Sequence, residues 1–444
     1  TKASTTTNVF NRKKQQSEQF AKEREHMLRE AEIKRRQAGG SASHKFIRLD
    51  DLAKGGQGLE QVDESVQEIF LTLWEPMHQV FSEMLCGFDQ QSIVQLCLTG
   101  IRMAVSVACH YAMETAINAY VATLVSATEL QDPFRQKSAR ARQCIKLVMI
   151  IAHNEGDRLG SGWESLMKAI SQLSRLQVLA LGGGEHMFNT TDPRPNQLQT
   201  IFSSRERDEA QMRAVSEEVM NELEADTIDR VFVKSPALGA ESIYALVQAM
   251  ANVGLVELDG ANVMETQGAG GGSHAEEGTT GAPRVFCLQK LVEVADYNIK
   301  YRSRIQWSNI WRIMSQQFTV AGIHSDPFVA QYAIDSLKQL SIKFMDKKEN
   351  RGFHFQEAFM QPFERIMQKS TINSNRELIL YVIGNIVDAK HHMLASGWKR
   401  VISVLAIAAE SGNDELVILA FSIAQKICLQ HFQAVANNNN FIAL

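Results

Sequence analysis

The chain has 444 residues and a formal net charge of −4 at neutral pH, which disfavours a dedicated nucleic-acid-binding protein. Its length exceeds what one compact core accommodates, so we expect several cores or one elongated array. Only eight prolines, with frequent Ala, Leu, Gln, Glu, Met and Lys, favour helices over strands. The six cysteines have no C-x-x-C spacing, so we interpret them as reduced core residues in a reducing compartment.

Residues 1–60 are predicted to be a connector. Residues 12–37 contain nine basic and five acidic residues, with a thin apolar seam of Phe20, Met27, Leu28 and Ala31. This pattern predicts a charged, solvent-exposed helix, or alternatively a basic helix that lies on a membrane surface. Glycines between residues 39 and 58 predict a linker that ends the connector.

Residues 92–128 predict a hairpin of two apolar helices. In the first helix, Gln95, Thr99, Arg102 and Ser106 form one narrow polar stripe on an otherwise apolar background. A surface helix shows the reverse pattern, so we expect neighbouring helices to cover this one on most of its circumference. Charged residues interrupt each apolar run well short of the roughly 20 residues that a bilayer requires, which predicts no transmembrane helix.

Residues 132–153 predict a helix that begins with Asp132 as N-cap and Pro133 in its first turn. After the cap this helix contains five basic residues and no acidic one. The five are Arg135, Lys137, Arg140, Arg142 and Lys146. One explanation is a solvated helix face; the other is a binding site for an acidic protein partner or for anionic lipid head groups.

Three tryptophans indicate an internal repeat. Trp163, Trp307 and Trp398 each lie sixteen residues after the start of an aliphatic run, and each opens a further apolar helix. Their intervals of 144 and 91 residues are close to multiples of about 45 to 48 residues, near the period of HEAT and armadillo repeats. We therefore predict an all-α fold, an α-solenoid of HEAT/armadillo-like helical hairpins with the tryptophans as packing residues. A loop at 182–205 and a Gly-rich flexible insert at 266–283 interrupt the array.

The sequence shows no catalytic constellation. His391 and His392 are the only close histidine pair, and adjacent helical residues diverge by about 100°, so they cannot share a metal ion. Motifs typical of nucleotide-binding, zinc-hydrolase and serine-hydrolase sites are missing from the sequence. We expect no enzyme activity, no metal site and no cofactor, with a site assembled from distant residues as the alternative.

A family resemblance adds to this reading. The segments that carry it include LCLTGIRMAVSVACHYAMETAINAYVATL (96–124), AHNEGDRLGSGWESLMKAISQLSRLQ (152–177), RVFCLQKLVEVADYNI (284–299), RIQWSNIWRIMSQQF (304–318) and SGWKRVISVLAIAA (396–409). In collinear order, over about residues 60–435, they resemble the region downstream of the catalytic domain in large Golgi Arf exchange factors of the Sec-seven and brefeldin-A-inhibited type.

The resemblance implies a first downstream homology unit at 61–225, a second at 226–436 and a tail at 437–444. The family's exchange reaction depends on a glutamate in an F-R-x-P-G-E loop, and this sequence has no such motif. The resemblance therefore implies a non-catalytic fragment that begins after the catalytic domain.

The function so implied is regulation of vesicle trafficking: membrane recruitment and autoinhibition or activation of an attached exchange domain. The implied location is cytoplasmic and peripheral on Golgi and trans-Golgi membranes. The implied partners are Arf and Rab GTPases, an anionic membrane surface, other domains of the same exchange factor and a second copy in a homodimer, with no nucleic acid. The five basic residues at 135–146 would steer the acidic GTPase surface or the lipid. The alternative function is a purely structural, dimerising scaffold that binds no GTPase.

Overall fold

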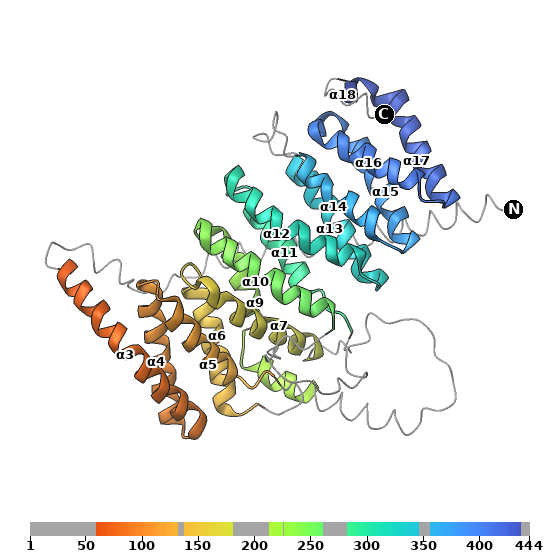
Figure 1. Ribbon diagram of the computed structural model, residues 1–444. Helices are drawn as coiled ribbons and strands as arrows, with labels where there is room; N and C mark the ends of the chain where they lie inside the picture. The colour runs from red at the N-terminus through yellow and green to blue at the C-terminus, as the bar shows by residue number, and fades with distance from the viewer. Residues whose placement is uncertain are drawn as a thin grey trace, which may run out of the picture. The chain divides into compact units, whose positions relative to one another are not determined.

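The computed structural model describes residues 59–131, 137–180, 213–224, 226–260, 282–345 and 356–436, with only the backbone at 59–62 and 64. These residues fall into two compact units, which divide between Ala282 and Pro283. Within the described ranges every regular element is a helix and no strand occurs (Figure 1). The all-α prediction is confirmed.

In the first unit each helix packs against the next one and the next but one, so successive hairpins stack. Helix α3 contacts α4 and α5, α4 contacts α6, and α5 contacts α7. The short helix α9 packs on α6, and α10 packs on α7. The bounds are α3 (Leu59–Gly87), α4 (Gln91–His110), α5 (Glu114–Ser126), α6 (Ala139–Asn154), α7 (Trp163–Ala180), α9 (Thr227–Val233) and α10 (Ala240–Leu258).

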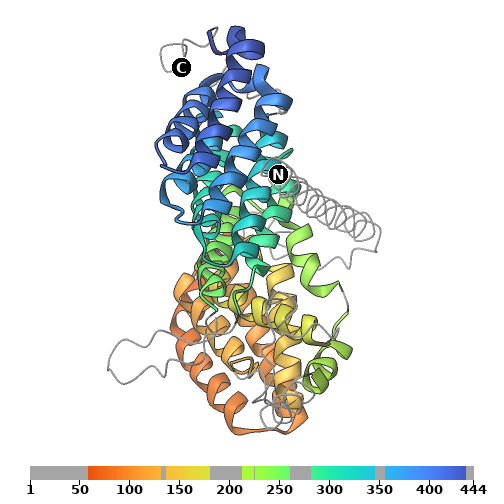
Figure 2. The ribbon, with the colours of Figure 1, turned by 90° about the vertical axis from the view of Figure 1, so that its right-hand side faces the viewer.

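The second unit repeats this arrangement. Helices α11, α13, α15 and α17 contact one another in sequence and form one layer, and α12, α14 and α16 form the other. Figure 2 shows helices of this unit lying side by side. The bounds are α11 (Phe286–Asn298), α12 (Arg304–Ile323), α13 (Pro327–Met345), α14 (Gln356–Lys369), α15 (Asn373–Lys390), α16 (Trp398–Ala409), α17 (Asp414–Lys426) and α18 (Phe432–Ala436). Stacked helical hairpins are thus present in both units, as predicted.

The three tryptophans are packing residues. The side chains of Trp163, Trp307 and Trp398 are almost completely buried, and the first and third of them begin α7 and α16. Trp307 lies in the first turn of α12 and stacks on Phe344, with ring centroids 5.3 Å apart. The repeat inferred from their spacing therefore corresponds to recurring inner positions of the helical array.

The expectation for α4 is wrong. One face of this helix is buried, but Leu96 is 72% exposed and Met103 is 58% exposed on the other side. The neighbours of α4 are α3, α5 and α6, which leave its outward side open. An apolar background around a helix therefore did not mean that other helices cover it.

The division into units also differs in position from the predicted homology units. The prediction divides the chain at 225/226, whereas α9 and α10 pack on α6 and α7 and so belong to the first compact unit. The homology boundary stays a prediction, because compactness and sequence homology need not divide a chain at the same residue. The connector at 1–58, the loop at 182–205, nearly all of the insert at 266–283 and the tail at 437–444 lie outside the described residues.

Candidate partner-binding site

The basic helix begins later than predicted. Ser138 is its N-cap, because the Ser138 hydroxyl accepts a hydrogen bond from the backbone N–H of Ala141 at 3.0 Å. Residues 132–136, which include the predicted cap and Arg135, lie outside the described residues. Lys137 is only 2% exposed, and its Nζ donates to the backbone carbonyl of Glu129 at 2.5 Å.

Arg140 connects α6 to the end of α3 through hydrogen bonds. Its guanidinium donates to the carbonyls of Leu85 and Cys86, at 3.0 and 3.3 Å. These belong to the last turn of α3, where helix geometry leaves carbonyls without intrahelical partners. The same group forms an ion pair of 3.2 Å with Glu129. Burial alone would raise the pKa of Glu129, but hydrogen bonds from Ser138 and Arg140 lower it overall. Arg140 is thus a structural connection between helices.

Arg142 and Lys146 pair with the helical segment at residues 213–221 and the turn that follows it. Arg142 lies 2.7 Å from Glu218 and 2.6 Å from Glu222, and the Nζ of Lys146 lies 2.9 Å from the second carboxylate oxygen of Glu222. The hydrogen bond from Lys146, with the nearby charge of Arg142, lowers the pKa of Glu222. The acidic segment therefore neutralises this side of α6.

The four described basic side chains consequently have partners within their own unit. Lys146 is the most accessible of the three that form ion pairs, with 44% of its side chain exposed against 18% for Arg140 and 19% for Arg142. A role of the five residues in partner binding stays a prediction. What sequence reasoning missed is the acidic segment, because its pairing with α6 spans more than 70 residues of chain.

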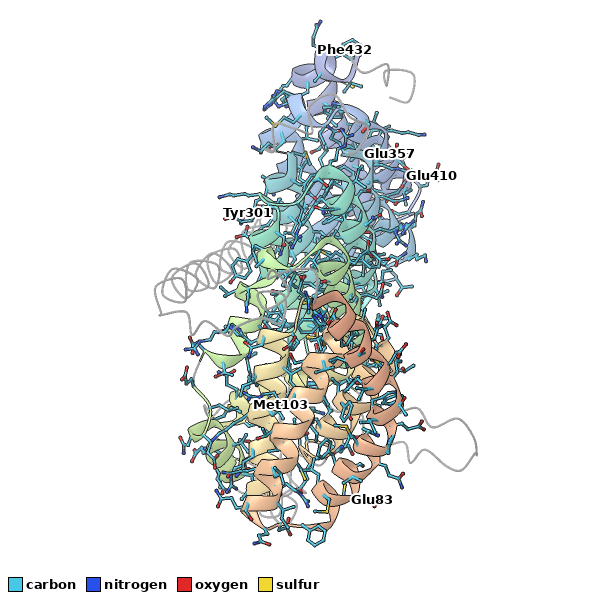
Figure 3. All side chains as sticks on the ribbon, turned by 90° about the vertical axis from the view of Figure 1, so that its left-hand side faces the viewer. Glu83, Met103, Tyr301, Glu357, Glu410 and Phe432 are labelled. Atoms are coloured by element: carbon cyan, nitrogen blue, oxygen red, sulfur yellow. The ribbon has the colours of Figure 1, made fainter. Side chains whose placement is uncertain are left out.

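Exposed apolar side chains are a second feature that the sequence analysis did not predict. On α3 and α4 they include Val80, Leu96 and Met103, and at the C-terminal end they include Phe421 and Phe432. Figure 3 shows Met103 on the outer surface of α4 and Phe432 at the last described helix. The seven-residue interval between Leu96 and Met103 was visible in the sequence, but we assigned both residues to the buried side.

By length and composition alone, two helices could cross a membrane: α4 and the run Asp414–Ala436. Both pack on neighbouring helices, and core helices of soluble proteins meet the same criterion, so this is weak evidence for a membrane span. Within the described ranges, no group of three or more His, Cys, Asp and Glu residues is placed to hold a metal ion.

Comparison with known proteins agrees with the family resemblance described above. Residues 343–426 match the family described as Mon2/Sec7/BIG1-like, HDS. The chain is 30% identical over 397 residues to brefeldin A-inhibited guanine nucleotide-exchange protein 1 of Homo sapiens, a match covering 84% of this chain and 20% of that protein. It is 27% identical to the ADP-ribosylation factor guanine nucleotide-exchange factor sec72 of Schizosaccharomyces pombe, covering 85% of this chain and 21% of that protein.

A plant relative shows a similar match. The chain is 29% identical over 400 residues to brefeldin A-inhibited guanine nucleotide-exchange protein 4 of Arabidopsis thaliana. The chain spans about a fifth of the length of these relatives. The resemblance inferred from the sequence is thereby confirmed, and the chain matches one region of the large Arf guanine nucleotide-exchange factors of the Sec7 and brefeldin A-inhibited type.

Proposed function

We propose that this chain is a non-catalytic, regulatory region of a large Arf guanine nucleotide-exchange factor that acts in vesicle trafficking at Golgi membranes. One observation carries the proposal: the similarity to named exchange factors extends over 84% of the chain, while the chain spans only a fifth of their length. In this proposal the region recruits the exchange factor to the membrane and controls its activity through Arf or Rab GTPases and lipid.

The stacked hairpins support a binding role. Solenoids expose long helical surfaces whose side chains are fixed by the packing of each hairpin on its neighbours. Both units have this construction, with buried tryptophans at the inner positions and charged residues outside. A surface of this kind can bind a folded GTPase without any catalytic group.

Within the basic helix, the proposal assigns partner contact first to Lys146. Among the three ion-paired basic residues of α6, Lys146 has the largest exposed fraction, so it is the first candidate for contact with an acidic GTPase surface or lipid. Arg140 and Arg142 stabilise the helix packing, and Lys137 is buried, so substitutions there would test folding as much as binding. Lys399, an exposed lysine at the start of α16, provides a control in the second unit.

The test is flotation of the purified chain with anionic liposomes, with and without membrane-anchored Arf loaded with a non-hydrolysable GTP analogue. We expect flotation that depends on activated Arf and is reduced by Lys146→Glu but not by Lys399→Glu. Flotation without Arf would make lipid the primary ligand. No flotation in either case would contradict the recruitment role.

The alternative, a dimerising scaffold, is favoured by one observation. Ile418, Phe421, Leu429 and Phe432 recur along the C-terminal helices at intervals of three, eight and three residues, and all are exposed. Light scattering that shows a stable dimer, together with no GTPase-dependent flotation, would favour the scaffold over the regulatory region.

A further inference from the structure

The last helix of the second unit contains a π-helical turn. Helix α17 continues through the turn η6 (Ile427–His431) into α18 without a break (Figure 1). A π-helical turn holds one residue more than an α-helical turn, and such turns are rare and occur frequently at functional sites. The side chains that this turn places against the rest of the unit are therefore candidates for a functional role.

The π-helical turn changes which residues of the last helix are buried. Before and at the start of the turn, the buried residues follow one another at intervals of four, three and four residues. They are Leu416, Ala420, Ile423 and Ile427. The next buried residue is Val435, eight residues after Ile427 instead of the seven that a continuous α-helix would favour. The inserted residue therefore rotates α18 by about 100° and brings Val435 onto the packed side.

A pair of histidines connects the π-helical turn to α15. His391 lies at the end of α15, where the short helix η4 (His391–Met393) begins, and it stacks on His431, the last residue of the turn. The ring centroids lie 4.1 Å apart, and the ring planes are inclined by 25°. The Nδ1 of His391 is buried and has no hydrogen-bond partner within the described ranges. A protonated imidazole carries an N–H at both nitrogens, so this environment favours the neutral ring.

The surroundings of the pair contain more basic than acidic groups. Within five residues of either histidine, the other titratable or charged residues are Asp388, Lys390, His392, Lys426 and Cys428. Helix α18 contains no charged residue. The charges that act on His431 come from His391, Asp388 and Lys426. Asp388 already forms an ion pair of 2.6 Å with Lys426, so one shared carboxylate is the nearest compensation for two protonated rings.

The protonation of His431 is linked to the packing of the turn. Burial, followed by the charge of His391, lowers the pKa of His431, while Asp388 raises it and Lys426 lowers it to smaller extents. A released turn therefore binds a proton at this residue more readily than the packed turn does. The packed state has its full stability above the ordinary histidine pKa of about 6.5. It loses stability as the pH falls from there through the lower pKa of packed His431.

We propose that the stacked His391–His431 pair is an acid-sensitive contact that holds residues 427–436 on the second unit and releases them when the histidines are protonated. Above that pH the neutral rings stack and Val435 is buried, which maintains the π-helical turn. Two like charges at this separation repel each other, so protonation separates the rings. The turn then relaxes to an α-helix, which rotates α18 by about 100° and moves Val435 into solvent. This device goes beyond the proposed function, because it depends on neither a GTPase nor lipid.

The test is native-state hydrogen exchange of the full chain at pH 7.5 and 5.5, with protection corrected for the pH dependence of intrinsic exchange. We expect residues 427–436 to lose protection at pH 5.5, while α15 keeps its protection. His431→Phe retains an aromatic ring against His391 but accepts no proton, so protection should persist at pH 5.5. The matched control His392→Gln removes the exposed neighbouring histidine and should leave the acid-induced loss in place.

A histidine titration followed by NMR provides an independent measurement. The resonance missing from His431→Phe assigns the residue, and its pKa should lie below the ordinary value in the unchanged chain. In His391→Gln the pKa of His431 should rise, because a neighbouring positive charge is removed. Equal protection of residues 427–436 at both pH values would overturn the proposal. An acid-induced loss that persists in His431→Phe, a loss that His392→Gln abolishes, or a His431 pKa unaffected by His391→Gln would overturn it as well.

Discussion

The same corner occurs once in each unit, at residues 152–163 and 387–398. In both, a helix ends, a short 3₁₀ turn follows, at Gly160–Gly162 or Ala395–Gly397, and a buried tryptophan opens the next helix. The leucine before each turn is buried, at positions 159 and 394. The two segments share few other residues.

Three of the recurring residues, the leucine, the glycine before the tryptophan and the tryptophan, are buried in both corners. A Cβ atom at Gly162 would lie 3.1 Å from Ile117, and one at Gly397 would lie 3.1 Å from Met360, so a larger residue at either corner would require the neighbouring side chain to shift. The equivalent positions 152 and 387 are both buried but hold alanine and valine. The comparison shows that the corner keeps its leucine, its second glycine and its tryptophan while other positions, buried ones included, change.

Two local differences separate the corners. Gly160 has a φ of 50°, which glycine adopts without strain, whereas Ala395 has a φ of 39°, which is unfavourable for a residue with a Cβ atom. The indole Nε1 of Trp163 donates to the carbonyl of Gly156 at 3.0 Å, whereas the buried Nε1 of Trp398 has no hydrogen-bond partner among the residues that the structure describes. The second corner therefore combines an unfavourable backbone conformation at Ala395 with an indole N–H at Trp398 that is unpaired within the described ranges, and the first corner has neither.

The largest expected effect comes from removing either tryptophan. Trp163→Ala or Trp398→Ala should lower the free energy of unfolding of its own unit by about 3–5 kcal/mol, because each leaves a large cavity among buried side chains. Hydrogen exchange can assign the loss to a unit. Trp163→Ala should increase exchange in α5 and α7 and leave α14 and α16 unaffected, and equal increases in both units would show that the corners are not independent.

A milder substitution should separate the two tryptophans. Trp163→Phe removes a buried hydrogen bond, whereas Trp398→Phe removes an indole N–H that has no hydrogen-bond partner in the described part of the chain. We expect Trp163→Phe to cost about 1 kcal/mol more in the free energy of unfolding, measured by urea denaturation. Equal costs would mean that the hydrogen bond to Gly156 contributes nothing net.

Substitution of the turn residue should lower stability in the first corner and raise it in the second. Gly160→Ala should destabilise the first unit by about 1 kcal/mol, because alanine disfavours positive φ. Ala395→Gly should stabilise the second unit by about 0.5 kcal/mol, since the relief of strain exceeds the added chain entropy of glycine. Thermal unfolding of the two variants checks this, and a destabilising Ala395→Gly would contradict the strain.

The corners should also respond differently to acid. Burial, followed by the charges of Lys234 and Arg230, lowers the pKa of His153, and the equivalent residue in the second corner is Asp388, which pairs with Lys426. The unfolded chain therefore binds a proton at His153 more readily than the folded chain does. The stability of the first unit should fall as the pH drops through the ordinary histidine pKa of about 6.5. Urea midpoints at pH 7.5 and 5.5 should differ less in His153→Leu than in the unchanged chain.

Much of the architecture was predictable from the sequence. The period of apolar residues and the Trp163, Trp307 and Trp398 intervals predicted stacked helical hairpins, because helical repeats must bury one face of each helix against the next. The resemblance predicted the family. The start of α6 at Ser138 was missed, since Asp132 and Pro133 also form a valid start signal and only the tertiary contacts select between them.

The candidate site was less predictable. Five basic residues on one predicted helix looked like a free charged surface, but Arg142 and Lys146 pair with Glu218 and Glu222. Local sequence shows the number and spacing of charges on an element and does not show what lies opposite them. For the same reason the exposure of Leu96 and Met103 was not foreseen.

The sequence by itself determined the fold class, the recurring tryptophans and the family resemblance, because these depend on residue type and spacing along the chain. Tertiary structure alone decided which charges are neutralised and which apolar side chains remain in solvent. Pairing and burial depend on distant segments brought together by packing, and a helix carries no local signal that tells whether its outward face is covered. The exposure of Leu96 and Met103 and the ion pairs of the basic helix are both decided by these tertiary contacts.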